Sequence, residues 1–395
     1  MDSISSYLHC LLDEVIGAGR MKDIGRLYLD VMQGRISSRQ EFSAAYGLRP
    51  SSVSATVAQL TRKKLIYQVT DTAARRGRPT WKLVLNRNLF FVCVMRISSR
   101  VLICEAVNVV GQIIEEVRED LGADCNNARM LGGFRRLYKR LRSNVSVTIR
   151  CIGITFCLPG ILDIPRGMWV MSSRWLDIHN LRLREAFPNT RTPIWVVRNI
   201  DSELRARMVD EANENVLLLH WGYGIGMSYC EGGDPINSSF GRFGEIGHWN
   251  VDRGSGSHCR CGRIGCVETY CALWALWPEL VREWPDVAEN EEAFLNQANR
   301  YPLLDNGKVE QGVAIMVNTL GDICRVLFPS KVLLSGSFFA NDAVLAEVYR
   351  TFLAAGVMPM VDSPKLSYVE HSGQLETQGA AIPVIVREIE RILTA

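Results

Sequence analysis

The stretch GEIGHWNVDRGSGSHCRCGRIGCVETY combines residue types that bind metal ions with residue types that accept hydrogen bonds. Cys259, Cys261 and Cys266 follow the spacing C-x-C-x4-C, and ten residues separate His248 from the first of these cysteines. One imidazole and three thiolates close a tetrahedral Zn2+ site and leave no position for water. The glycines between the cysteines allow the loop to fold back, so the spacing predicts one structural zinc ion per chain.

Two alternatives to this zinc site remain open. The cysteines could be reduced and buried, or His258 could replace His248 as a ligand, although its position beside Cys259 disfavours the geometry. The chain has twelve cysteines and no recognisable secretion signal, which favours thiols and a metal site over disulfides. Cys271 and the remaining cysteines are predicted to lie in the core.

Two glutamates, Glu245 and Glu268, bracket the predicted metal ligands. Carboxylates beside a rigid loop accept hydrogen bonds from hydroxyl groups, which makes a sugar the expected ligand. Solvated glutamates, or glutamates that support His248, are the alternatives. A DNA-binding zinc finger is disfavoured because no helix with basic residues lies nearby.

Length and composition describe a soluble globular protein of two or three domains. The chain has 395 residues, of which 47% are hydrophobic and 22% are charged. Its start lacks a basic segment followed by an apolar run, and no stretch of about 18 apolar residues occurs. We therefore expect a cytoplasmic protein without a signal peptide or membrane span.

The N-terminal region carries a local excess of basic charge. Between Arg49 and Lys82 there are eight Lys or Arg residues and one acidic residue, Asp71, an excess of +7, whereas the whole chain has a net charge of +3. Such an excess is typical of a segment that binds a polyanion, and a solvated basic face is the alternative.

The same region has the pattern of a winged helix-turn-helix. Apolar spacing predicts a helix over 21–33, and Ser38 and Glu41 resemble a capping box at the start of a short second helix. Gly47 supplies a turn before a third helix over 50–64. LIYQVT and WKLVLN then predict two strands joined by the basic tip DTAARRGRPT.

Side chains that contact DNA are expected on the third helix and on this tip. Val53, Val57 and Leu60 should face the core, which leaves small polar side chains for phosphates and base edges. The arginines of the tip suit insertion into a minor groove. The candidate DNA-binding residues are Ser51, Ser52, Ser54, Thr56, Arg75, Arg76 and Arg78.

These motifs together resemble the ROK family of repressors, open reading frames and sugar kinases. The hallmark pair G-E-x-G-H and C-x-C-G-x-x-G-C-x-E is intact, and a helix-turn-helix module ending in RGRP resembles the repressor branch, which includes N-acetylglucosamine and glucose-type repressors. Further matches are Leu158-Pro159-Gly160, Trp175, Gly222, Gly224, Gly226 and Ser335-Gly336. The resemblance covers nearly the whole chain.

The resemblance implies an α/β protein with an N-terminal winged helix-turn-helix followed by a two-lobed, actin-like ATPase or sugar kinase fold that carries the zinc loop. Apolar runs such as FFVCVMRIS, RVLICEAVNVV, GQIIEEV, CIGITF, IWVVRN, VLLLHW and KVLLSG fit the strands of such lobes. We expect the DNA-binding domain over 1–86, the first lobe over 87–200 and the second lobe over 201–395, with the last helix able to return to the first lobe. The residues that correspond to the family's sugar ligands are Asn199, Asp201, Glu245, His248 and Glu268.

Altered phosphate-binding elements separate a regulator from a kinase. ROK kinases carry D-x-G-G-T where this chain reads RISSR from Arg96, so the metal-binding aspartate and the glycines that approach phosphate are missing. Kinases carry Asn-Asp, with Asp as general base, where this chain reads Asn199-Ile200-Asp201, and the alignment puts either Ile200 or Asp201 at the base position. Tyr223 also replaces the usual Thr of the second glycine loop.

We therefore predict a non-enzymatic transcriptional regulator of carbohydrate metabolism genes, and we favour a repressor over an activator. Its partners would be a double-stranded DNA operator, a sugar or sugar-phosphate effector, and further copies of itself in a homodimer or homotetramer, since helix-turn-helix proteins usually read two half-sites. The effector would change the pose of the DNA-binding heads and weaken operator binding. The alternative is an ATP-dependent sugar kinase with a fused DNA-binding domain. If no sugar binds, a regulatory protein would be the partner.

Overall fold

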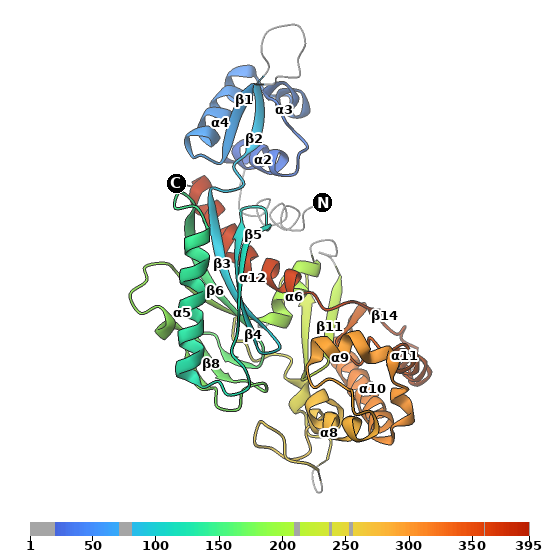
Figure 1. Ribbon diagram of the computed structural model, residues 1–395. Coiled ribbons are helices and arrows are strands. Elements are labelled where there is room, and N and C mark those ends of the chain that lie inside the picture. Colours follow the sequence, from blue (N-terminus) through green and yellow to red (C-terminus); the bar gives the residue numbers. More distant parts are fainter. Residues whose placement is uncertain are drawn as a thin grey trace.

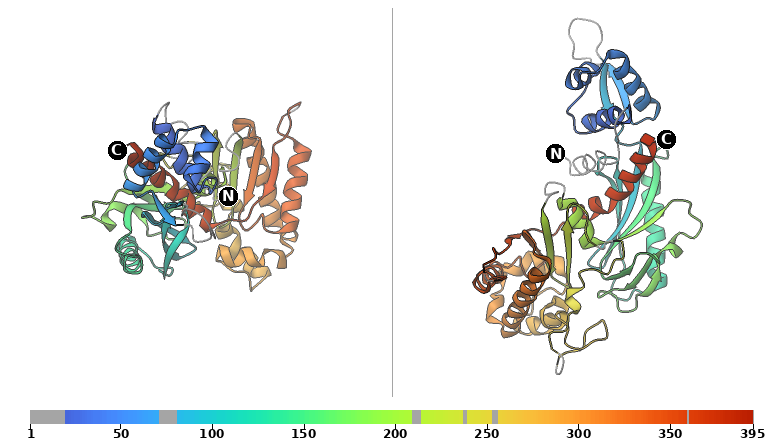
Figure 2. Two further views of the ribbon diagram at one scale, coloured as in Figure 1. Left: turned by 90° about the horizontal axis from the view of Figure 1, so that it is seen from above. Right: turned by 180° about the vertical axis from the view of Figure 1, so that it is seen from behind.

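The structure is a computed structural model and describes residues 20–70, 81–208, 214–236, 239–252, 256–358 and 360–394. A small helical unit stands at one end, and two larger α/β lobes lie beyond it (Figures 1 and 2). Arg75, Arg76 and Arg78, the proposed DNA contacts of the basic tip, lie outside the described residues.

Three helices and a two-stranded antiparallel ribbon form the N-terminal unit, as the sequence predicts. They are α2 (Arg20–Met32), α3 (Arg39–Tyr46), α4 (Pro50–Arg62), β1 (Ile66–Thr70) and β2 (Trp81–Leu85). Ser38 caps α3 by accepting a hydrogen bond from the backbone N–H of Glu41, whose carboxylate reaches back to the N–H of Ser37. Gly47 ends α3 with a left-handed φ of 62°, and this turn leads into α4.

Helix α4 has the predicted buried and exposed sides, but one proposed DNA contact is wrong. The buried side chains are Val53, Val57 and Leu60, and the exposed ones are Ser51, Ser52 and Ser54. Thr56 is only 3% exposed, and its hydroxyl donates to the carbonyl of Ser52. Thr56 lies three residues after Val53 and therefore on the same, buried side of the helix. It is not available to DNA.

A five-stranded sheet of order β10-β6-β3-β4-β5 forms the first lobe. Its elements are β3 (Phe90–Ser98), β4 (Val101–Asn108), β5 (Ile113–Asp120), β6 (Arg150–Leu158), β10 (Ile194–Arg198) and the covering helix α5 (Asn127–Asn144). A smaller sheet contains β7 (Ile161–Asp163), β8 (Met168–Met171) and β9 (His179–Arg182), and a 3-10 turn, η1, spans Leu183–Ala186. The strands predicted in this region are confirmed.

Strand β3 is buried on both faces, which explains its unbroken apolar sequence. Alternate side chains of a strand point to opposite faces, so Phe91 packs in the cluster with α5 while Val92 packs in the cluster with the C-terminal helix. β3 runs parallel to β6 and antiparallel to β4. A strand covered on both sides has no polar face to show in the sequence.

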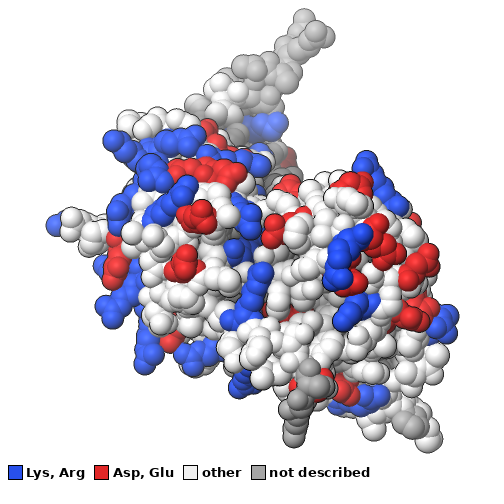
Figure 3. Space-filling view, turned by 60° about the horizontal axis from the view of Figure 1, so that its bottom comes forward, with Lys and Arg blue, Asp and Glu red and all other residues white. Residues whose placement is uncertain are grey.

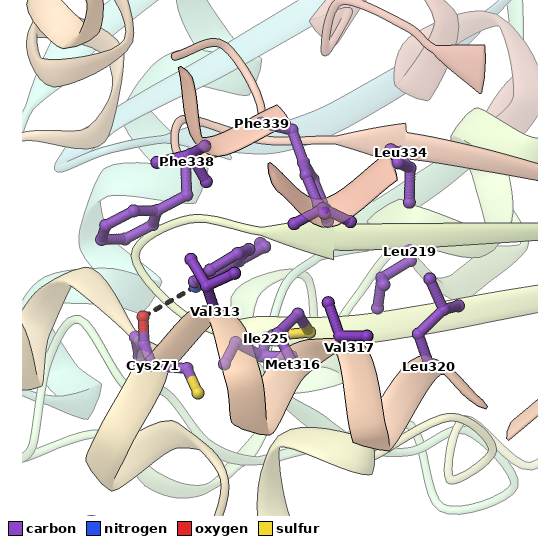
Figure 4. Packing of buried hydrophobic residues seen from close by; sticks show 14 of the residues in the cluster. Leu219, Ile225, Cys271, Val313, Met316, Val317, Leu320, Leu334, Phe338 and Phe339 are labelled. Carbon is purple, nitrogen blue, oxygen red and sulfur yellow. Dashed lines mark hydrogen bonds between the residues drawn. The ribbon is translucent and has the colours of Figure 1, made fainter. Parts of the chain in front are cut away.

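The second lobe has a four-stranded sheet of order β12-β11-β13-β14. Its strands are β11 (Asn215–Trp221), β12 (Ile225–Glu231), β13 (Lys331–Ser335) and β14 (Lys365–Tyr368). The helices are α7 (Glu268–Cys271), α8 (Leu273–Glu283), α9 (Glu291–Gln297), α10 (Gly307–Leu327) and α11 (Asp342–Ala355), with 3-10 turns η3 (Ile246–His248), η4 (Ala298–Arg300) and η5 (Leu303–Asp305). Residues of α10 pack on Leu219 and Leu334, and the Trp221 indole donates to the carbonyl of Cys271 at 2.7 Å (Figure 4).

The last helix returns to the first lobe. Helix α12 (Gly373–Thr394) packs against β3, β6 and helix α6 (Asn199–Arg207), and its C-terminal end lies beside the N-terminal unit (Figure 1). One apolar cluster joins side chains of α2 and α4, of β3 and of α12. The Lys63 ammonium, just after α4, donates to the carbonyl of Ile392 at 2.6 Å. The N-terminal unit therefore rests on the end of α12.

Basic charge is not confined to the N-terminal unit. Residues 127–207 contain fifteen Lys or Arg and five Asp or Glu, an excess of +10, which is larger than the +7 of the segment Arg49–Lys82. Basic side chains line the outer edge of the half on the left in Figure 3. Charge alone therefore does not locate a DNA-binding surface in this chain.

Among the helices in the described part of the chain, none combines the length and the apolar character that a bilayer crossing requires.

The contact between α12 and α6 yields a prediction about stability. A Cβ atom added to Gly379 would lie 1.7 Å from the carbonyl oxygen of Ser202, so Gly379→Ala must separate the two helices. We expect a loss of about 1–3 kcal/mol in unfolding free energy, typical of overpacked sites, measured by denaturant titration. Gly307→Ala is the matched control, because no atom lies within 4 Å of its added Cβ. Equal stability of the two variants would contradict the close packing.

Candidate functional site

A cleft opens between the two lobes and collects side chains from both. The described residues that line it are Pro159, Gly160, Ile161, Met171, Ser173, Arg174, Arg198, Asn199, Ile200, Glu203, His220, Tyr223, Gly224, Ile225, Gly226, Glu245, His248, Arg260, Glu268, Glu291 and His371. They come from the segments that follow β6 and β8, the end of β10 and the start of α6, the end of β11 and the start of β12, the loop after β12, α7, α9 and the segment before α12. The cleft is strongly charged.

Four predicted metal ligands converge on one side of this cleft. The ligand atoms of His248, Cys259, Cys261 and Cys266 all lie within 4.8 Å of one another, so these residues could hold a metal ion. The Cys259 Sγ lies 3.6 Å from the His248 Nδ1. His258, the rival ligand, is exposed and is not in this group.

Two glycines let the loop reach this arrangement. Gly262 and Gly265 have φ angles of 88° and 72°, in the left-handed region that side chains rarely adopt. A Cβ on Gly265 would also lie 1.8 Å from the carbonyl oxygen of Asp252. Backbone conformation therefore favours glycine at both positions, and lack of space also requires it at Gly265.

Three of the predicted sugar ligands meet in the cleft. His248 directs Nδ1 toward Cys259 and Nε2 toward Glu245, at 4.0 Å from its Oε2. Glu268 accepts hydrogen bonds from the Ile225 N–H at 3.0 Å and from the Trp274 indole at 3.2 Å. These two hydrogen bonds fix the orientation of the Glu268 carboxylate.

Only the first two residues of the Asn-Ile-Asp segment reach the cleft. Asn199 and Ile200 line the cleft, whereas Asp201 is 2% exposed and does not. The Asp201 Oδ1 accepts hydrogen bonds from Ser228 at 2.8 Å and from Arg198 at 3.2 Å, behind the first turn of α6. Asp201 as a sugar contact is therefore wrong, because α6 begins at Asn199 and turns the third residue away from the cleft.

Arg198 is a cleft residue that the sequence reasoning missed. It is buried, and its guanidinium lies 3.2 Å from both Asp201 and Glu245. Burial raises the pKa of Glu245, and the positive charge of Arg198 opposes this shift. The sequence did offer one indication of this role, because Arg198 directly precedes the predicted sugar ligand Asn199.

The segment at Arg96 does not form an open anion site. The Arg96 Nε lies 2.9 Å from Glu105 and 3.1 Å from the Thr377 hydroxyl, and Arg96 is 7% exposed. Gly373 leaves room for this guanidinium, because a Cβ there would lie 2.6 Å from its Nη1. The charge of Arg96 is therefore neutralised inside the protein.

Tyr223 fills the middle of the second glycine loop. It is 6% exposed, and the guanidinium carbons of Arg174 and Arg260 lie 5.0 and 5.5 Å from its ring centre. Arg260, within the cysteine loop, donates to the Tyr223 hydroxyl at 2.9 Å and also to the carbonyl of Ser173. One arginine thus links the cysteine loop to the first lobe.

His371 joins two buried carboxylates beside the cleft. Its Nδ1 lies 2.9 Å from Glu203 and its Nε2 3.6 Å from Glu376, which also accepts a hydrogen bond from Asn199 at 2.7 Å. Burial acts to lower the pKa of His371, but Glu376, Glu203 and Glu291 outweigh it and raise the pKa to about 9. No local sequence pattern marks His371, because its partners come from distant segments.

The chain is similar to several known proteins. The model described as "ROK family" matches residues 137–384. A xylose repressor from Bacillus spizizenii is 22% identical over 344 residues, which cover 85% of this chain and 87% of that protein. The DNA-binding transcriptional dual regulator NagC of Escherichia coli is 22% identical over 320 residues, or 78% of each protein.

Solved structures share the fold across both classes of the family. A ROK family transcriptional regulator, described as a homolog of the E. coli MLC protein, has a TM-score of 0.70 at 20% identity and covers 95% of this chain and 99% of its own. A ROK family glucokinase from Streptomyces griseus, solved with glucose and AMPPNP, has a TM-score of 0.59 at 15% identity and covers 74% and 98%. A regulator and a kinase therefore share the fold, which alone does not separate the two activities.

The contacts of His371 predict how stability depends on pH. A raised pKa means that the stabilisation is complete below about pH 6.5 and is lost as the pH rises toward about 9. The unfolding temperature of the wild type should fall over this interval more steeply than that of His371→Gln. The exposed His179 offers the control His179→Gln, which should keep the wild-type slope. Identical slopes for wild type and His371→Gln would contradict the ion pairs.

Proposed function

Because the chain belongs to the ROK family, we propose that it is a DNA-binding transcriptional repressor that responds to a sugar or sugar phosphate. The relatives that match most of its length include a xylose repressor and NagC. The proposal rests on the combination of a three-helix N-terminal unit with a cleft that contains hydrogen-bond acceptors. At the position of the kinase aspartate, this chain has a buried Arg96–Glu105 pair.

The proposed DNA surface is the exposed side of α4 together with the tip between β1 and β2. Ser51, Ser52 and Ser54 are exposed on α4, and small hydroxyl side chains allow close approach to phosphates and bases. Arg39 donates to Ser54 and to Gln68 of β1, which adds a positive charge beside this surface. Arg75, Arg76 and Arg78 of the tip would enter the adjacent minor groove.

The proposed effector is a small carbohydrate in the cleft. Glu245, His248, Glu268 and Asn199 supply several acceptors and donors within one cleft, as a ligand with many hydroxyl groups requires. Solvated or merely supporting glutamates remain a weaker account, because both carboxylates face the cleft.

A sugar kinase is the less favoured function. Phosphoryl transfer needs a positioned metal ion and groups that stabilise the transferred phosphate. At the corresponding places this chain has Arg96 paired with Glu105, Ile200 facing the cleft and Tyr223 packed between two arginines. Each of these replaces a polar contact that a kinase would use.

Helix α12 is the proposed route from effector to DNA. Its first turns carry Glu376 and Thr377, which bond to Asn199 and Arg96, and its last turn contacts the N-terminal unit through Lys63. The helix has 22 residues, about 33 Å at 1.5 Å per residue, and spans this distance without a break in its assignment, although Pro383 lies within it. An effector that binds one lobe arrangement better would shift the pose of the DNA-binding heads.

The proposed domain division remains 1–86, 87–200 and 201–395. The first boundary falls between β2 and β3, and the second falls at the start of α6. A homodimer or homotetramer would bring two DNA-binding heads to two half-sites. A regulatory protein would replace the sugar if no carbohydrate binds.

Structural zinc is the proposed metal of the cysteine loop. Two sulfurs bound tetrahedrally at about 2.3 Å from zinc lie about 3.8 Å apart, and the Cys261 and Cys266 Sγ atoms are separated by 3.8 Å. Three thiolates and one imidazole suit Zn2+ and complete its coordination. When bound, the ion would order the loop that carries His248 and Arg260.

The zinc proposal predicts about one Zn per chain in purified protein, measured by elemental analysis. Cys261→Ser should lower the metal content and the unfolding temperature, because an open loop loses its cross-link. Cys151→Ser is the control, since Cys151 lies in β6, outside the group of ligands. A metal-free protein of wild-type stability would rule out the zinc site.

The proposed role of the tip predicts that its arginines contribute to the salt dependence of DNA binding. Arg76→Ala combined with Arg78→Ala should weaken binding on all sequences and reduce the slope of log K against log salt by about 1 per lost phosphate contact. Arg282→Ala, an exposed arginine of α8, is the control and should leave the slope unchanged. Wild-type binding by the double variant would remove the tip from the interface.

The function itself is tested by sequencing genomic fragments that the purified protein retains. We expect a shared operator near carbohydrate genes, and release of that operator by one member of a panel of sugars and sugar phosphates. Incubation with ATP and the same panel should give no sugar phosphate. Failure to retain specific DNA would overturn the repressor assignment, and clear turnover of ATP and a sugar would favour the kinase.

A further inference from the structure

A carboxylate of this chain lies directly against the glycine loop of the cleft. A Cβ atom added to Gly222 would lie 1.6 Å from the Glu291 Oε1, so only glycine leaves this carboxylate its place. Glu291 belongs to α9, about 70 residues beyond Gly222 in the chain. It is 9% exposed, although acidic side chains normally face water.

Two donors hold the Glu291 carboxylate at this position. The His220 Nε2 lies 2.8 Å from Oε1, and the Arg174 Nη2 lies 3.2 Å from Oε2. Burial acts to raise the pKa of Glu291, but His220, Arg174 and His371 outweigh it, so the pKa is lowered. The niche therefore accommodates a fully ionised oxyanion.

The same carboxylate connects the two lobes. Arg174 follows β8 in the first lobe, and Glu291 lies in the second. Two neighbouring bonds cross at this place: the Ser99 hydroxyl lies 2.9 Å from the Asn290 Oδ1, and the Ser98 hydroxyl 3.2 Å from the Glu292 Oε2. Moving Glu291 out of its niche removes the Arg174–Glu291 ion pair from this contact, in which the Arg100–Glu289 pair, at 3.7 Å, remains.

We propose that Glu291 is an internal competitor in an oxyanion site formed by Arg174, His220 and the backbone at Gly222, and that the phosphate group of a ligand displaces it. Carboxylate and phosphate oxygens accept charge-assisted hydrogen bonds from the same donors. The absence of a side chain at Gly222 lets either group approach the backbone closely. Displacement breaks the Arg174–Glu291 ion pair and weakens the contact between the lobes.

This inference rests on the proposed function where it concerns DNA. A phosphorylated sugar that displaces Glu291 would alter the lobe arrangement and thereby the start of α12. The anion site itself is independent of DNA, so it is tested by direct ligand titration. If the wild type binds no operator, the proposed function fails while the titration still decides the oxyanion site.

The experiment compares phosphate binding by full-length wild type and Glu291→Gln, using calorimetry with inorganic phosphate at constant ionic strength. We expect Glu291→Gln to bind phosphate at least tenfold more tightly than wild type, because the amide leaves the donors without an anion. Adding Arg174→Ala to this variant should abolish the gain. An equal affinity of wild type and Glu291→Gln would overturn the proposal.

Glu292→Gln is the matched control. Glu292 lies in the same turn of α9, but its carboxylate contacts Ser98 and neither Arg174 nor His220. Glu292→Gln should bind phosphate with the affinity of the wild type. If Glu292→Gln and Glu291→Gln gain affinity equally, the gain comes from the loss of any negative charge nearby, and the proposal is overturned. Glucose 6-phosphate and ATP are tested in parallel, and a gain restricted to ATP would also overturn it.

Gly222→Ala tests the displacement should Glu291→Gln fail to fold. The added Cβ occupies the position of the Glu291 Oε1 and excludes the carboxylate without changing any charge. Amide hydrogen exchange of residues 98–100 and 289–292 should then become faster, while phosphate binding is not gained because the niche is filled. Unchanged exchange in both segments would overturn the contact between lobes.

Discussion

The buried ion pair between Arg96 and Glu105 is the interaction on which the rest of the cleft depends. Two charges removed from water are stable only with close geometry and further hydrogen bonds, and removal of one partner from such a pair typically costs about 3–5 kcal/mol. Arg96 contacts Glu105 through two nitrogens and also bonds to Thr377, so β3, β4 and the start of α12 are joined at one point. The same guanidinium anchors the start of α12, whose last turn contacts the N-terminal unit through Lys63.

The acidic side chains around the cleft already have partners. Glu245 pairs with Arg198, Glu268 with a backbone amide and an indole, and Glu376 with Asn199. A ligand must therefore exchange existing bonds for its own, and several of these bonds join different segments of the chain. Part of the binding free energy can then change the relative positions of these segments, as a sensor requires.

The fold is compatible with both a regulator and a kinase, so activity depends on individual side chains. The cleft is lined by Glu245, His248 and Glu268, whose side chains can accept hydrogen bonds, and by Tyr223 and Glu291. Arg96 is paired with Glu105 in the protein interior. The proposed sensing role rests on these side chains and not on the fold.

The sequence by itself determined the features that depend on neighbours in the chain. Apolar patterns located the three N-terminal helices and most strands of the lobes, and short spacing with glycines identified the cysteine group. The burial of Thr56 follows from the same helical period and was predictable. We expected Thr56 at the DNA surface because its side chain is polar, and did not consider its position on the helix. The direction of Asp201 and the meeting of Arg174, His220, Glu291 and His371 were decided only in the tertiary structure. These side chains come from separate strands, helices and loops, and their contacts arise from how the two lobes and α12 pack, which no local pattern encodes.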